Sequence, residues 1–70
     1  KAVLVPQDPI TVYGRELPVF NNGEMVIAVE ERVAENRYSL YLGANIEDLT
    51  QRAKDDFARR GVKSEALATL

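Results

Sequence analysis

The sequence contains neither cysteine nor histidine in its 70 residues. Without cysteine no disulfide can reinforce the fold, and without either residue type a structural zinc site is not expected. The same absences exclude the serine–histidine and cysteine–histidine mechanisms, together with the most common general base near neutral pH. A chain of this size buries only about 60% of the surface that its unfolded form exposes. Stability must therefore come from close packing or from association.

Long apolar runs are also absent. The longest, Met25 to Val29, is far shorter than the stretch of about 20 residues that spans a bilayer. We therefore expect no membrane-spanning segment. The lack of cysteine is typical of a cytoplasmic protein, which is the location we expect.

Neither sign of charge is in large excess. Nine basic and eleven acidic residues give a net charge of −2. Residues 1–44 carry six acids and four bases, and residues 45–70 carry five of each. Because proteins that bind nucleic acids usually gather lysine and arginine on one face, this balance disfavours strong non-specific binding to phosphates.

The composition is that of an ordered globular domain, with 46% hydrophobic and 29% charged residues. We expect a single small domain over residues 1–70, with a β-meander at 2–42 and a helical part at 45–70. The chain begins with lysine rather than methionine. We therefore expect it to be a piece of a longer protein.

The first strands are short and interrupted by turn residues. Residues 2–5 predict a strand that stops at the prolines Pro6 and Pro9. Residues 10–13 alternate between apolar and polar and predict a second strand. Gly14 and Arg15 then predict a two-residue turn with glycine first.

The next hairpin has a strong turn signal. Residues 17–20 predict a strand that lies at an edge or contains a bulge, because Pro18 has no amide donor. Asn22 and Gly23 both tolerate positive φ and predict a tight two-residue turn, which would place Phe20 opposite Met25.

The last two strands are the most apolar. Residues 24–33 predict the longest strand, and residues 34–36 a turn. Residues 37–42 then return with Tyr38, Leu40 and Leu42 on one face and Tyr41 on the other.

A helix follows. Asn45 is a good N-cap, with Asp48 placed to complete a capping box, and Gly61 is a C-cap. A second short helix is expected at residues 65–70, capped by Ser64. The spacing of the apolar residues predicts one buried stripe on the first helix, made of Ile46, Leu49, Ala53 and Phe57.

The sequence therefore predicts an α+β fold. A small antiparallel β-meander of three to five strands is packed on one side by a helix over residues 45–60, followed by the short C-terminal helix.

No constellation of residues predicts catalysis. Glu30 and Glu31 point to opposite faces if they lie on a strand, so they cannot act together on one substrate. Asp55 and Asp56 each have an arginine four residues further on, which is typical of a solvated charged helix face. We expect no enzyme activity, no metal and no cofactor.

A DNA-binding domain remains an alternative. Gly61 stands between two predicted helices, as in a helix-turn-helix over residues 50–70. However, Phe57 lies where that motif normally has a small residue. In this alternative the residues that contact DNA are Arg59, Arg60, Lys63 and Ser64.

The favoured hypothesis is a non-enzymatic protein–protein interaction or oligomerisation module within a larger protein. Aromatic side chains are common at contact sites, and so small a domain cannot bury all of those on its strands. Two leucines in a short terminal helix also need a surface to pack against. The expected contact residues, for a protein partner or a second copy, are Phe20, Tyr38, Tyr41, Leu67 and Leu70.

Overall fold

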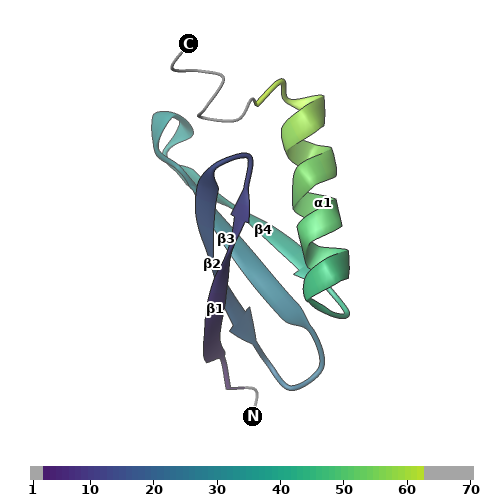
Figure 1. The fold of residues 1–70 in the computed structure, drawn as a ribbon. Coiled ribbons are helices and arrows are strands. Elements are labelled where there is room, and N and C mark those ends of the chain that lie inside the picture. Colours follow the sequence, from purple (N-terminus) through teal and green to yellow (C-terminus); the bar gives the residue numbers. More distant parts are fainter. Residues whose placement is uncertain (1–2, 63–70) are drawn as a thin grey trace.

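The computed structural model describes residues 3–62, which form four antiparallel strands in the order β1-β2-β3-β4 and one helix that packs against the sheet (Figure 1). This confirms the predicted α+β meander. The helix expected at residues 65–70 lies outside the described residues. The elements are β1 (Val5–Val12), β2 (Arg15–Asn21), β3 (Val26–Arg32), a 3-10 turn (Val33–Glu35), β4 (Arg37–Gly43) and α1 (Ile46–Arg59).

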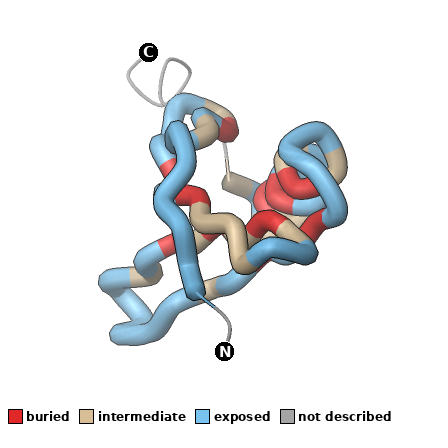
Figure 2. Tube along the Cα trace, turned by 90° about the horizontal axis from the view of Figure 1, so that it is seen from below, coloured by how far each residue is buried: buried red, intermediate tan, exposed pale blue. Residues whose placement is uncertain are grey.

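The core lies between the sheet and α1. Along β2, β3 and β4 buried positions alternate with more exposed ones, as expected when one face is covered by a helix, whereas β1 is exposed over most of its length (Figure 2). Of the predicted helix stripe, three residues are buried, while Ile46 at its start remains 42% exposed. The buried apolar residues are Val12, Leu17, Val19, Val26, Ala28, Tyr41, Leu49, Ala53 and Phe57.

The edge strand β1 differs from the prediction. The sequence predicts that a strand stops at Pro6 and Pro9, but β1 runs through both. An edge strand tolerates proline because one side of its ladder is unpaired. Its pairing with β2 also shifts between Gln7 and Ile10, so that two residues of β1 stand against one residue of β2, Pro18. The sequence predicts that the strand with Pro18 lies at an edge or contains a bulge, but β2 is an inner strand and the extra residue is on β1, opposite Pro18.

The turn between β1 and β2 is one residue earlier than predicted. Val12 pairs with Arg15, so Tyr13 and Gly14 are the turn residues, with φ of 51° and 80°. Positive φ at both positions is the geometry that a tight hairpin requires. The Tyr13 ring is held 6.2 Å from the ring of Phe57, measured between centroids, which supports this unusual backbone.

The loop between β2 and β3 is longer than the predicted two-residue turn. The side-chain oxygen of Asn22 accepts hydrogen bonds from the backbone amides of Glu24 and Met25, both at 2.9 Å. This local bonding widens the loop. Phe20 consequently pairs with Ile27, and the predicted pair with Met25 is wrong. The shift is of two residues, so the side chains keep their predicted faces.

The N-cap of α1 is Asn45, as predicted, but the carboxylate of Asp48 bonds the amide of Ala44 instead of completing the capping box at Asn45. Asn45 Oδ1 accepts a hydrogen bond from the Asp48 amide at 2.8 Å, and Asp48 Oδ2 accepts one from the Ala44 amide at 3.1 Å. The helix also begins very close to the end of β4. A Cβ atom on Gly43 would lie only 2.7 Å from the backbone nitrogen of Leu49.

The end of α1 also agrees with the prediction. Gly61 has a φ of 76°, and its amide donates to the carbonyl of Ala58 at 3.1 Å. The amide of Val62 donates to the carbonyl of Phe57 at 2.9 Å, which completes a Schellman motif. Val62 then packs against the core.

Candidate functional site

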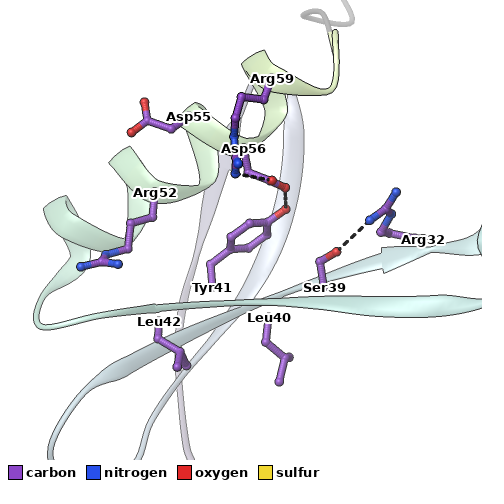
Figure 3. Close-up of a pocket in the computed structure, with 9 residues that line it drawn as sticks. All are labelled: Arg32, Ser39, Leu40, Tyr41, Leu42, Arg52, Asp55, Asp56 and Arg59. Carbon is purple, nitrogen blue, oxygen red and sulfur yellow. Dashed lines mark hydrogen bonds and ion pairs between the residues drawn. The ribbon is translucent and has the colours of Figure 1, made fainter.

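The sheet has one face that no described element covers. We call it the open face, the side away from α1. On β4, alternate residues point to this side: Tyr38 is 65% exposed, Leu40 63% and Leu42 46%. Figure 3 shows Leu40 and Leu42 pointing away from the helix, on the opposite side of β4 from Tyr41 and Ser39.

The apolar side chains on the open face form continuous rows across the sheet. Leu42 pairs with Ile27 on β3, and Ile27 pairs with Phe20 on β2. A second pair joins Leu40 to Val29. Because directly opposite residues have Cβ atoms about 5 Å apart, these side chains form one strip. With Tyr38, the strip comprises Phe20, Ile27, Val29, Tyr38, Leu40 and Leu42.

Two carboxylates border this strip. Glu16 and Glu31 line a shallow hollow of about 290 Å³ together with Val29, Tyr38 and Arg15, whose guanidinium lies 3.8 Å from Glu30. Both carboxylates are exposed, and neither forms an ion pair with another residue in the range 3–62. The open face therefore combines apolar side chains with unpaired negative charge.

The structure brings some of the expected contact residues together. Phe20 and Tyr38 lie on the open face. Tyr41 lies on the other side of β4 and is only 8% exposed, because α1 covers it. Leu67 and Leu70 lie outside the described residues.

Tyr41 belongs to a polar cluster that joins the sheet to the end of α1. Its hydroxyl lies 2.9 Å from Glu30 Oε1 and 2.7 Å from Asp56 Oδ2, so its single proton bonds one carboxylate at a time. Arg60 Nη2 donates to the same Glu30 oxygen at 2.7 Å. Arg60 Nε lies 3.1 Å from Asp56 Oδ2, but not in hydrogen-bond alignment. Arg15 approaches Glu30 at 3.8 Å.

The cluster shifts the titration of its members. Burial, together with the bonds to Asp56 and Glu30, raises the pKa of Tyr41 well above its ordinary value of 10.0. The hydrogen bond from Tyr41, and the nearby charges of Arg60 and Arg59, lower the pKa of Asp56 below 3.8. Burial lowers the pKa of Arg60, but the hydrogen bond to Glu30 and the nearby acidic groups together outweigh it, so the net shift of this pKa is upward. These pKa shifts keep Asp56 ionised, Arg60 protonated and the Tyr41 hydroxyl neutral, which is typical of a structural ion-pair network.

A groove of about 750 Å³ runs between the free edge of β4 and α1. Ser39 and Tyr41 of β4 line it, and the helix contributes Arg52, Asp55, Asp56 and Arg59 (Figure 3). The helix thus covers the face of β4 but leaves room beside its edge.

Of the four residues of the DNA-binding alternative, the structure describes Arg59 and Arg60, and both form ion pairs. Arg59 pairs with Asp56 at 2.8 Å, and Arg60 pairs with Glu30. Phe57 is completely buried against the sheet. Lys63 and Ser64 lie outside the described residues.

Within residues 3–62 no group of three or more acidic side chains is placed to hold a metal ion, and α1 is too short and too polar to cross a membrane. A scan against protein-family models gives no match, and searches of curated proteins and of solved structures give none either.

Proposed function

We propose that this domain is a non-enzymatic interaction module whose open face binds a protein segment that offers apolar side chains together with a lysine or arginine. The observation that carries the proposal is the exposure of Tyr38, Leu40 and Leu42 in one uncovered strip. Large exposed apolar strips on small soluble domains are typical of contact sites.

The strip has the chemistry of an interface centre. Two aromatic side chains, Phe20 and Tyr38, stand among aliphatic ones, and aromatic residues are enriched at the centres of interfaces. Complete burial of one large apolar side chain contributes about 1.5–3 kcal/mol, so a few such contacts suffice for a weak but specific complex.

The charges beside the strip favour a basic partner. Glu16 and Glu31 are unpaired within residues 3–62, so a lysine or arginine on the partner would meet a free carboxylate. The ring of Tyr38 lies beside the same hollow and can also accept a cation. A second copy of this sheet face carries only acids at these positions, which favours a different chain as the partner here. The cysteine-free composition supports a cytoplasmic location.

A display library of random peptides tests this proposal. We expect selected peptides to combine apolar residues with lysine or arginine, and to bind Ile27→Lys at least about tenfold more weakly. With the Glu31→Lys variant as the target, the selected peptides should carry acidic residues in place of basic ones. The matched control is Glu47→Lys, which makes the same charge change at an exposed position on α1. Selected peptides without basic residues, or binding that Ile27→Lys leaves unchanged, would overturn the proposal.

A further inference from the structure

The two edges of the sheet are not equivalent. On β1, two prolines, Pro6 and Pro9, and the bulge between Gln7 and Ile10 interrupt the backbone donors and the strand direction. Proline and bulges are the features by which natural sheets prevent further pairing at an edge. The other edge, β4, contains no proline, and it pairs with β3 without any shift over its whole length from Arg37 to Gly43. Its outer backbone groups are therefore regularly spaced for another strand.

We propose that β4 pairs antiparallel with the β4 of a second copy, so that two four-stranded sheets form one continuous sheet about a two-fold axis near Leu40. The contact is made through the backbone edge of β4, although Tyr38, Leu40 and Leu42 of the open face border it. The inference extends the proposed interaction module by naming how it self-associates.

The sequence of β4 is self-complementary in this arrangement. With the axis at Leu40, the open-face residues meet as Leu40 with Leu40 of the second copy and Tyr38 with Leu42 of the second copy. Apolar side chains directly opposite one another stabilise an antiparallel pair. Leu40 and Tyr38 are the two most exposed residues of the strip, and strand pairing would place an apolar side chain directly beside each of them.

The groove beside β4 provides the space for this partner. Its volume of about 750 Å³ lies along the strand edge, where the second β4 and the side of its helix would enter. The groove-lining charges of α1 are two arginines and two aspartates, and Arg32 of β3 is paired with Glu35 at 2.7 Å. The groove is therefore close to neutral, and a second copy brings both signs of charge to it. A strongly acidic or basic peptide has no such match.

The paired sheets also suit the proposed function. The two-fold axis is perpendicular to the continuous sheet. Both helices therefore lie on one side of that sheet, and both open faces lie on the other. The dimer would present two adjacent apolar strips to a partner, and a partner with two binding segments would gain affinity from this arrangement.

Substitution of Leu40 by residues of either charge tests the proposed pairing of the β4 edges. We expect sedimentation equilibrium to show a dimer of the unmodified chain at concentrations up to about 1 mM. Leu40→Lys and Leu40→Glu should each weaken association at least about tenfold, because like charges would face each other across the axis, and an equimolar mixture should restore it. Ile27→Lys is the matched control, since it places a charge on the open face but away from the β4 edge.

Distances between spin labels separate this geometry from stacking of the two open faces. The chain has no cysteine, so Leu40→Cys or Gln7→Cys each provides a single labelling site. Edge pairing places two Gln7 labels seven strand spacings apart, roughly 34 Å at about 4.8 Å each, and the two Leu40 labels close together. Face-to-face sheets lie only about 10 Å apart, so the two Gln7 labels would be much closer together than about 34 Å.

Each result is decisive. A monomer at all concentrations, close Gln7 labels, or no recovery in the mixture of Leu40 variants would overturn edge pairing. Peptide binding that persists in a monomer would then leave the proposed function intact. Conversely, a dimer with the expected distances but without selected peptides would retain edge pairing and remove the open-face function.

Discussion

Tyr41 connects three parts of the molecule through one hydroxyl group. It lies between Glu30 on β3 and Asp56 on α1, and its ring packs edge-on against Phe57 with the centroids 6.1 Å apart. A buried hydroxyl between two carboxylates is stable only while it keeps its proton, because the phenolate would add a third negative charge.

We predict that Tyr41→Phe lowers the free energy of unfolding near neutral pH by about 1–2 kcal/mol. The loss stays modest because Glu30 keeps Arg60 as a donor, and Asp56 keeps Arg59. Urea denaturation measures it, with Tyr38→Phe at the surface as the control.

The same substitution should change the response to alkali. The folded-state pKa of Tyr41 is raised above 10.0, so its contribution is fully present below pH 10.0 and is lost as the pH rises further. The unmodified protein should therefore lose stability above pH 10.0 more steeply than Tyr41→Phe. Equal slopes for the two proteins would show that the hydroxyl does not have the burial described.

For single residues, the sequence predicts which face of the sheet a side chain occupies but not which residues that side chain contacts. Strand alternation correctly places Glu30 and Glu31 on opposite faces. It does not reveal that Glu30 pairs with Arg60, because the two residues are 30 positions apart and meet only through tertiary packing. For the same reason, the alternation along β4 predicts that Tyr41 lies on the face opposite Tyr38, Leu40 and Leu42, but it does not predict that the helix covers Tyr41.

Among the elements, the helix follows its local signals closely and the hairpins do not. The caps at Asn45 and Gly61 act within a few residues, so the sequence predicts both ends of α1. The hairpin turns depend on small energy differences between alternative turn conformations. Tyr13 takes a positive φ that tyrosine seldom adopts, and the Asn22 side chain replaces a tight turn by a wider loop.

We predict that Asn45→Ala lowers the free energy of unfolding by about 1 kcal/mol, since the amide of Asp48 loses its side-chain acceptor. Asn45→Ser is the matched variant, because serine is also a good N-cap and should retain most of the stability. Denaturant titration compares the three proteins. A serine variant as unstable as the alanine variant would show that the cap bond is not the cause.

For the molecule as a whole, the charge distribution argues against nucleic acid as the main ligand. The net charge is −2, and the arginines at the end of α1 are both engaged in ion pairs. Phosphate binding would have to compete with Asp56 and Glu30 for them.

We therefore predict weak binding to a labelled random-sequence duplex at low salt and none near physiological salt, as measured by fluorescence anisotropy. Arg59→Ala should change the result little. Tight binding that weakens steeply with salt, and that Arg59→Ala reduces, would instead support the DNA-binding alternative.

The sequence predicts the α+β class, the meander and the strip of Tyr38, Leu40 and Leu42, because these follow from periodicity. It does not predict which face the helix leaves open, since either side of β4 carries large apolar or aromatic residues. That choice depends on the short connection from Gly43 to α1 and on the buried contacts of Phe57.

The prolines of β1 have a consequence for the size of any assembly. A sheet that accepts strands at both edges can add molecules without limit and grow into a filament. Among residues 3–62, Pro6 and Pro9 interrupt one edge of the sheet and leave the β4 edge for pairing. Once that edge is occupied, growth stops, and the protein can gain a partner through its backbone without becoming a template for aggregation.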